Sequence, residues 1–250
     1  MNDVYLQVEK NIDNLVDNGV GFSIPVTHEQ IEEFKTTRKN DIMPPSEWIP
    51  KNISDMTVLL LAGAGGQQAP LFAALGADVT VIDLSDKMLE QDRIVAERED
   101  LKIIIEKGNM CDLSRFADSS FDLIVNPPSL FYVPDVIPVF KECYRVLKDG
   151  GIFIASLANP INYMCNYDDE KDIYTICNPL PFISHEHDKG CAEAGWVEYG
   201  HTWDSYIGGQ TRCGFAIIGC IEGYNPKAPC DSWLQTKAIK YTHYHSSYGC

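Results

Sequence analysis

Positive charge is scarce in this chain of 250 residues, which has 20 lysines and arginines against 36 aspartates and glutamates and a net charge of −16. The basic residues are also scattered, so no local cluster offsets the acidic balance. A chain of this kind repels a phosphate backbone. We therefore expect no nucleic-acid partner.

Long apolar runs are missing as well. No run approaches the roughly 18 residues that a membrane-spanning helix needs. The first residues, MNDVYLQVEKNIDN, lack the basic and apolar regions of a signal peptide. The sequence predicts a soluble, cytoplasmic protein without membrane contacts.

Paired cysteines are a third absence. The nine cysteines are scattered, and no Cys-x-x-Cys pair occurs. An odd number in a chain expected in the cytoplasm favours reduced thiols over disulfides. Cys177, His185, His187 and Cys191 have the side chains of a metal site, but their spacing matches no zinc signature. We predict that the protein holds no metal.

From Thr57 onward, apolar strand patterns alternate with helical patterns, which is typical of a parallel sheet. Strands of this kind are expected at residues 57–62, 78–85, 102–108, 121–126 and 152–158, followed by an antiparallel pair at 215–223 and 234–241. The predicted fold is α/β. It is a doubly wound, Rossmann-like, seven-stranded sheet with an antiparallel C-terminal strand, an N-terminal helical segment and a lid insertion after the fifth strand.

The remaining segments depart from that alternation. Residues 1–50 are polar, with a helix expected at 28–38, and we assign them to an N-terminal helical cap. Residues 51–250 form the main domain. Within it, residues 160–200 are rich in Tyr, Asn, Asp and Pro and too long for a plain loop. We expect a lid at about 160–200, with one hairpin strand near 174–178.

A turn of small residues, Ala62-Gly63-Ala64-Gly65-Gly66, joins the first strand to a helix and allows a ligand to approach the backbone closely. Asp83 ends the second strand about 20 residues later, where a carboxylate can accept both hydroxyls of a ribose. The pair indicates a ribose-containing cofactor. A nicotinamide dinucleotide is one candidate, but Gln68 replaces the third glycine of that fingerprint and no substrate domain follows the fifth strand.

The other candidate rests on a resemblance. The motifs VLLLAGAGG, VTVIDLSDKML, EKGNMCDL, FDLIVNPPS and CYRVLKDGGIFIAS follow one another in order. Residues 57–160 thereby resemble the class I S-adenosylmethionine-dependent methyltransferases of the small-molecule type. GGQQAPLFAALGA, VPDV and IGGQ are similar to a little-characterised bacterial subgroup of that family. The last motif is the most specific, because dehydrogenases lack it.

The resemblance implies S-adenosylmethionine as cofactor and a set of residues around it. These are Ala62, Gly63, Ala64, Gly66, Gln67, Asp83, Leu84, Met88, Asn109, Met110, Cys111, Asn126 and Pro127. The chain departs from the family where Leu60 replaces an acidic residue, Ala62 and Ala64 replace glycines, and Asn109 replaces an aspartate. Alanine still leaves the backbone N–H groups free, and an asparagine can both donate to and accept from the adenine edge.

The motif Asn126-Pro127-Pro128-Ser129 leaves two interpretations. Enzymes that methylate amino groups carry Asn-Pro-Pro-Tyr or Asn-Pro-Pro-Phe here, but Ser129 lacks the ring that stacks on a planar acceptor. We favour the alternative that Asn126 and Pro127 close the cofactor pocket near the methionyl group, while Ser129 to Tyr132 face the acceptor.

Methyl transfer needs mainly in-line positioning of a nucleophile. An oxygen or sulfur acceptor would also need a general base. His201 is the first candidate, with His185 and His187 as alternatives, and Trp48, Ser129, Tyr132 and Tyr206 are candidates for binding a small-molecule acceptor. A catalytically inactive protein that binds S-adenosylmethionine stays open as a second hypothesis. The sequence does not distinguish a monomer from a homodimer.

Overall fold

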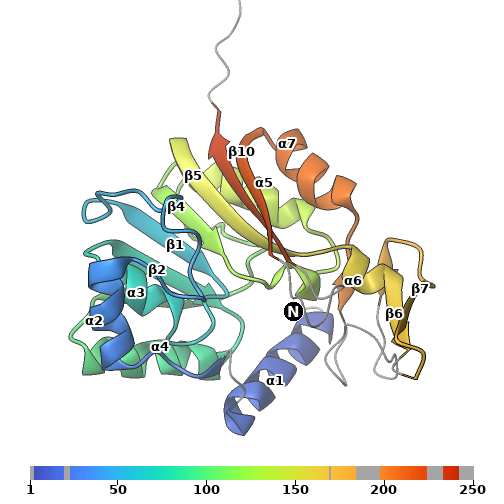
Figure 1. Ribbon diagram of the computed structural model, residues 1–250. Helices are drawn as coiled ribbons and strands as arrows, with labels where there is room; N and C mark the ends of the chain where they lie inside the picture. Colours follow the sequence, from blue (N-terminus) through green and yellow to red (C-terminus); the bar gives the residue numbers. More distant parts are fainter. Residues whose placement is uncertain (1–2, 20–22, 169, 184–197, 224–232, 242–250) are drawn as a thin grey trace, which may run out of the picture.

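The computed structural model describes residues 3–19, 23–168, 170–183, 198–223 and 233–241 (Figure 1). Its centre is a seven-stranded sheet with the order β10-β11-β5-β4-β1-β2-β3. The strands are β1 Thr57–Leu61, β2 Asp78–Asp83, β3 Ile103–Lys107, β4 Phe121–Asn126, β5 Leu147–Ala158, β10 Phe215–Gly223 and β11 Trp233–Lys240. β1 to β5 are parallel, and β11 is antiparallel to both β5 and β10. The predicted seven-stranded α/β fold is confirmed.

Strand β1 shows why the central strands are apolar throughout. Val58 and Leu60 pack into one core, while Leu59 and Leu61 pack into another, because successive side chains point to opposite faces of a sheet. Leu60, which replaces an acidic residue of the family pattern, is fully buried. A carboxylate at that position would lie unpaired in an apolar core.

Helices cover both faces of the sheet. α2 His28–Thr37, α3 Gln68–Ala74 and α4 Asp86–Arg98 lie on the face of Val58, and α5 Ile137–Val146 lies on the face of Leu59. α2 is the helix expected at 28–38. It begins with a capping box in which Thr27 and Gln30 satisfy each other's backbone N–H groups.

The first helix, α1 Asp3–Asn18, stands apart from these layers and contacts α4 (Figure 1). Residues 28–53, in contrast, pack against the sheet. Their side chains Ile31, Phe34, Trp48 and Ile53 belong to the apolar core on one of its faces. The N-terminal region therefore has two parts with different surroundings: α1 at the carboxyl ends of the strands, and α2 with its connector against one face.

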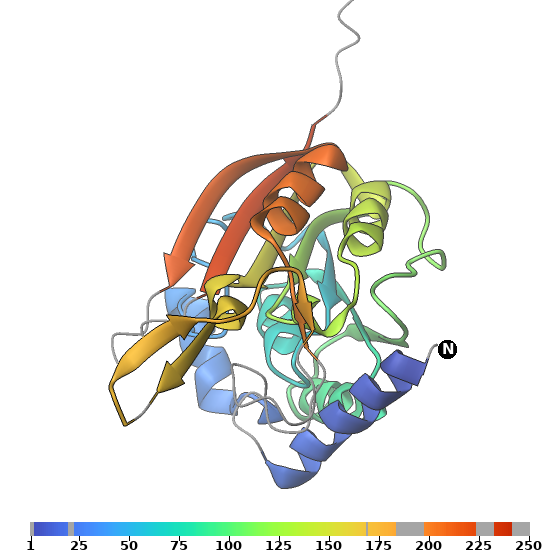
Figure 2. The same ribbon diagram turned by 90° about the vertical axis from the view of Figure 1, so that its right-hand side faces the viewer.

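The region after β5 forms α6 Ile161–Met164 and a hairpin of β6 Cys165–Asp168 with β7 Ile173–Ile176, which extends from the body of the protein (Figure 2). The hairpin strand expected near 174–178 corresponds to β7. A short pair, β8 Phe182–Ile183 with β9 Tyr199–Gly200, follows. A π-helical turn η3 Asp204–Gly208 then continues into α7 Gly209–Arg212. The expected lid also includes residues 184–197, which lie outside the described part of the chain.

No helix in the described ranges is both long enough and apolar enough to cross a bilayer. Nor do the described residues bring together three or more metal-ligating side chains. Of the cysteines and histidines considered above for a metal site, Cys177 is exposed, and His185, His187 and Cys191 lie outside the described residues.

Candidate active site

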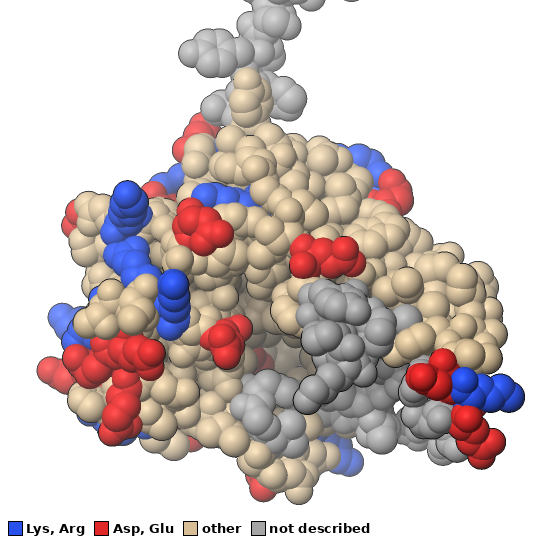
Figure 3. Space-filling view, in the orientation of Figure 1, with Lys and Arg blue, Asp and Glu red and all other residues tan. Residues whose placement is uncertain are grey.

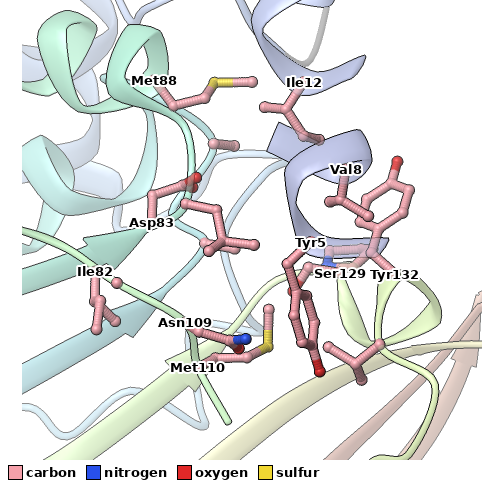
Figure 4. Close-up of a pocket in the computed structure, with 16 residues that line it drawn as sticks. Tyr5, Val8, Ile12, Ile82, Asp83, Met88, Asn109, Met110, Ser129 and Tyr132 are labelled. Carbon is pink, nitrogen blue, oxygen red and sulfur yellow. The ribbon is translucent and has the colours of Figure 1, made fainter. Parts of the chain in front are cut away.

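A pocket lies at the carboxyl ends of β1 and β2, beneath α1 (Figure 4). Its walls come from α1, the loops after β1, β2 and β3, and the segment after β4. The lining residues are Tyr5, Val8, Ile12, Ala62, Ala64, Ile82, Asp83, Leu84, Met88, Gly108, Asn109, Met110, Pro128, Ser129, Tyr132 and Val133. Ligands of open α/β sheets bind at this edge of the sheet. The segments that the motifs single out therefore meet at one place.

The sequence identifies most of the sheet-side wall. The lining residues that were named in advance are Ala62, Ala64, Asp83, Leu84, Met88, Asn109, Met110, Ser129 and Tyr132. Tyr5, Val8 and Ile12 were missed, although a signal for them exists. Together with Leu15 they repeat at helical spacing, so α1 has one apolar stripe. In Figure 4, Tyr5, Val8 and Ile12 of this stripe lie on one side of the pocket, with Asp83, Met88 and Asn109 on the other.

The loop after β1 has a strained backbone. Ala62, Ala64, Gly65 and Gly66 have φ angles of 55°, 58°, 42° and 72°, in the left-handed region. A non-glycine residue in that region costs about 1–2 kcal/mol, so the surroundings must hold this shape. The N–H of Ala62 donates to the carbonyl of Ile82 at 2.9 Å. The loop curves toward the pocket through Ala62 and Ala64, which line it.

Other residues of the first motif support the loop from outside the pocket. Gly63 packs closely against Val81 and Leu60, and a Cβ at this position would lie 3.2 Å from Val81 Cγ2. The amide of Gln67 donates to the carbonyl of Ile24 at 2.8 Å, and that of Gln68 donates to the carbonyl of Ile42. Gln68, which replaces a small residue of the dinucleotide fingerprint, therefore binds the N-terminal segment. The structure places Gly63, Gly66 and Gln67 behind the lining residues.

Asp83 ends β2 with its carboxylate in the pocket wall. Its Oδ1 accepts the N–H of Ser85 at 2.8 Å. Burial raises the pKa of Asp83 to about 6, although the backbone N–H groups of Ser85 and Leu84 oppose the shift. At pH 7 and above the group is therefore mostly ionised and can accept two hydroxyl groups.

Asn109 and Tyr5 form the opposite end of the pocket. Asn109 Oδ1 accepts the N–H of Cys111 at 2.9 Å, and the Cys111 sulfur lies 3.5 Å from the Tyr5 hydroxyl. Burial raises the pKa of Tyr5 to about 12, so its hydroxyl stays protonated. Cys111, which was expected to contact the cofactor, does not line the pocket and links Asn109 to α1.

Asn126 lies behind the pocket wall. Its side chain is fully buried, and Nδ2 donates to the carbonyl of Leu61 at 3.2 Å and to Ser129 Oγ at 2.9 Å. Ser129 Oγ in turn donates to the carbonyl of Pro127 at 3.1 Å. Pro128 and Ser129 line the pocket, whereas Asn126 and Pro127 do not. The side chains of Asn126 and Ser129 thus form hydrogen bonds within the motif, and Asn126 also joins the end of β4 to the end of β1.

Asn126→Ala should therefore destabilise the fold. We expect a loss of about 1–3 kcal/mol in the free energy of unfolding, because buried hydrogen-bonding groups lose their partner. Urea denaturation measures this loss. Ser129→Ala is the matched control, since it keeps the bond from Asn126 to Leu61 and should cost less. Equal stability of Asn126→Ala and the wild type would contradict a structural role.

His201 is buried beside the pocket but does not line it. Its Nε2 lies 3.2 Å from the carbonyl oxygen of Leu130 and 3.0 Å from that of Val133. Carbonyl oxygens only accept, so Nε2 carries the hydrogen and Nδ1 is the basic nitrogen. Burial lowers the pKa of His201, which keeps the ring neutral at pH 7. The imidazole holds the short helix η2 Leu130–Tyr132, which contributes Tyr132 to the wall.

Two residues expected to contact the acceptor lie elsewhere. Trp48 packs into the core on the α2–α4 face of the sheet, next to Gly219. Tyr206 is fully buried in the other core, where its ring contacts His201 with centroids 5.2 Å apart. Neither belongs to the pocket lining.

Charge around the site is mixed. On the face shown in Figure 3, lysines and arginines lie interspersed with aspartates and glutamates, and the surface is hollowed near its centre. α1 is joined to the sheet side by polar contacts: Ser85 donates to Asp13 at 2.6 Å, and Lys107 pairs with Glu9 at 2.6 Å. These contacts lie at the border of the pocket, whose α1 wall is mainly apolar.

The comparisons with known proteins agree with this geometry. A family model described as a methyltransferase domain matches residues 60–155. An uncharacterized methyltransferase of Bacillus subtilis, YbaJ, is 37% identical over 236 residues, which cover 89% of this chain and 91% of the relative. A ubiquinone biosynthesis O-methyltransferase of Nitrosomonas europaea is 31% identical over 147 residues, covering 55% of this chain and 58% of the relative.

A solved structure shares the fold. The S-adenosylmethionine-dependent methyltransferase of Mesorhizobium loti superposes with a TM-score of 0.64 at 22% identity, covering 77% of this chain and 94% of that one. The similarity to the Bacillus relative extends over nearly the whole length of both chains. The chain therefore belongs to the class I methyltransferases, and its cofactor is S-adenosylmethionine.

Proposed function

We propose that the protein transfers the methyl group of S-adenosylmethionine to a small-molecule acceptor that binds beside Ser129 and Tyr132. The observation that carries this proposal is the enclosure of the pocket by α1, whose Tyr5, Val8 and Ile12 form a wall opposite the strand ends. A site walled on that side suits a small acceptor better than a large polymer. The net charge of −16 also disfavours a polyanionic substrate.

The lining residues fit the cofactor by their chemistry. Asp83 would hold the ribose hydroxyls, and Asn109 would contact the adenine edge. Leu84, Met88 and Met110 offer the apolar walls that a flat aromatic ring needs. The backbone of the strained loop at residues 62–66 would hold the methionyl end. Asp83, Asn109 and this loop lie on three different connections of the sheet, so only the folded chain brings them together.

The sulfonium of the cofactor supplies an already activated methyl group. The contribution of the protein is to align the acceptor, which can lower a barrier by about 7–11 kcal/mol. Ser129 and Tyr132 would align it from the segment after β4. For an oxygen or sulfur acceptor, His201 remains our candidate base, since its neutral ring leaves Nδ1 able to accept a proton. Because His201 does not line the pocket, the proton would have to reach it through an intervening group. The second role of His201 would be to fix the position of η2.

Methylation of an amino group held by Asn126 has less support. The Asn126 Nδ2 already donates to Leu61 and Ser129, while Oδ1 is buried and has no partner among the described residues. Asn126 does not line the pocket, so an amine could reach Oδ1 only if the wall formed by Pro128 and Ser129 moved. The named relatives include an O-methyltransferase of ubiquinone biosynthesis, which favours an oxygen acceptor over an amine.

Calorimetry followed by a transfer assay tests the proposal. We expect micromolar binding of S-adenosylhomocysteine and no binding of NAD⁺. Transfer of a labelled methyl group should then be detected to one class in a panel of small phenols, thiols, amines and carboxylates. Cofactor binding without turnover on any class would favour the inactive binder. Transfer only to RNA or protein would contradict the small-molecule acceptor.

A further inference from the structure

A buried carboxylate supports the cofactor loop from the side opposite the pocket. We propose that Asp92, on α4, is a positioning residue whose carboxylate fixes the peptide of Gly66 and so keeps residues 62–66 in the shape that holds the cofactor. The Gly66 N–H donates to Asp92 Oδ1 at 2.8 Å, and both groups are buried. This inference rests on the proposed placement of the cofactor against that loop.

Hydrogen bonds and close packing fix the position of Gly66. Its φ of 72° is left-handed, and its carbonyl accepts the N–H of Val26 at 2.9 Å. A Cβ at this position would lie 2.9 Å from Pro25 Cβ and 3.0 Å from the carbonyl oxygen of Gln91. The peptide groups on either side of Gly66 are therefore each held by a hydrogen bond, and Asp92 is the side chain that holds one of them.

Burial of the ionised Asp92 carboxylate destabilises the fold. Asp92 is 1% exposed, and its Oδ2 has no hydrogen-bond partner among the residues that the structure describes. The charged groups that act on it are Asp83, on β2, which disfavours its ionisation, and Arg93, on its own helix, which favours it. Burial is the largest effect and raises the pKa of Asp92 to about 7.

An asparagine could accept the same hydrogen bond and would bury no charge, at the smaller cost of a buried NH2 group. The ionised carboxylate offers a stronger bond, because charge-assisted hydrogen bonds are roughly twice as strong as neutral ones. The loop needs that strength, since Ala62 and Ala64 are strained. The ionised Asp92 thus destabilises the fold as a whole while it holds the loop in one shape. This combination indicates that the carboxylate serves cofactor binding and not stability.

Stability against pH follows from the direction of the shift. The folded state binds the Asp92 proton more tightly than the unfolded state does, so this group lowers the free energy of unfolding as the pH rises toward 7. This loss begins near pH 4, so the difference in melting temperature between Asp92→Asn and the wild type should be smallest below that pH. At pH 8 the melting temperature of Asp92→Asn should exceed that of the wild type by at least about 2–4 °C.

The binding experiment compares Asp92→Asn, the wild type and the control Glu97→Gln, which removes a carboxylate from an exposed position of the same helix. Calorimetry with S-adenosylhomocysteine at pH 8 should show about five- to tenfold weaker binding for Asp92→Asn and no change for Glu97→Gln. The wild-type affinity should also fall as the pH drops through 7. In Asp92→Asn this decrease should be smaller, because of the two carboxyl groups only Asp83 then titrates in this range.

The proposal requires both a higher melting temperature at pH 8 and weaker binding in Asp92→Asn. A lower melting temperature, or an unchanged affinity, overturns it and leaves Asp92 a structural residue. Asp83→Ala separates this failure from a failure of the proposed site. If the loss of Asp83 also leaves binding unchanged, Asp83 does not hold the ribose and the proposed placement of the cofactor fails.

Discussion

Asp83→Ala is expected to weaken the binding of S-adenosylmethionine about 10- to 150-fold at pH 8, which corresponds to roughly 1.5–3 kcal/mol for hydrogen bonds to a charged group. Asp83 lines the pocket at the end of β2, and the hydrogen bonds that hold it come from the backbone of the next turn. Its remaining acceptor capacity is therefore available to two ribose hydroxyls. Calorimetry with S-adenosylmethionine or S-adenosylhomocysteine measures the loss.

The pH dependence of binding gives a second test of Asp83. Its pKa of about 6 means that protonation below this value removes the charged acceptor, so affinity should fall as the pH drops through 6. Asp78→Ala is the matched control, because Asp78 is exposed at the other end of the same strand. Asp83→Ala should lack the step near pH 6. If its affinity equals that of Asp78→Ala, Asp83 does not hold the ribose.

Val8→Asp should weaken cofactor binding at least about tenfold by displacing α1. Val8 is 7% exposed and packs with Tyr132, Ile12, Leu15 and Leu84. A carboxylate among these side chains costs several kcal/mol unless it is released to water, and release requires α1 to leave the pocket. The ion pairs of Lys107 and Lys87 with α1 cannot prevent this, since exposed pairs contribute about 0–1 kcal/mol each.

Leu6→Asp provides the control for Val8→Asp, because Leu6 is on the same helix but 49% exposed. Calorimetry gives the two affinities, and hydrogen exchange shows whether α1 has lost protection while the strands keep theirs. We expect faster exchange in α1 of Val8→Asp alone. Equal affinities for the two variants would mean that α1 does not form a wall of the occupied pocket.

The sheet could be predicted because its signals are local. The run TVLLL of β1 and the alternation of strands with helices indicate a sheet covered on both faces, and the structure confirms it. The ends of the strands then brought Ala62, Asp83 and Asn109 to one edge. The family motifs worked for the same reason, since each occupies one strand and the turn that follows it.

The α1 wall was harder to predict. Its apolar stripe is narrow, and polar residues such as Glu9 and Lys10 lie between its members, so the segment resembles a solvated region. A helix over a pocket buries only one stripe and has no need of a broad apolar face. The spacing of Tyr5, Val8 and Ile12 was a better guide than the polarity of the segment.

The roles of single residues depended on tertiary neighbours that no local pattern shows. Trp48 was a candidate for the acceptor site because it is aromatic and follows prolines, yet it fills the core beside Gly219. Asn126 was expected in the pocket wall, but the hydroxyl of Ser129 turns its amide inward. The family assignment excludes the dinucleotide oxidoreductase, whose fingerprint Gln68 had already failed to match.

The strand order also affects how the chain is completed during synthesis at the ribosome. β10 is made before β11, yet β11 lies between β10 and β5. Until residues 233–240 have been translated, the edge of β5 has no neighbour and β10 has no place in the sheet. Bare strand edges pair readily with other chains. A premature stop between residues 223 and 233 would therefore release a product that has all of the lining residues of the pocket but tends to aggregate.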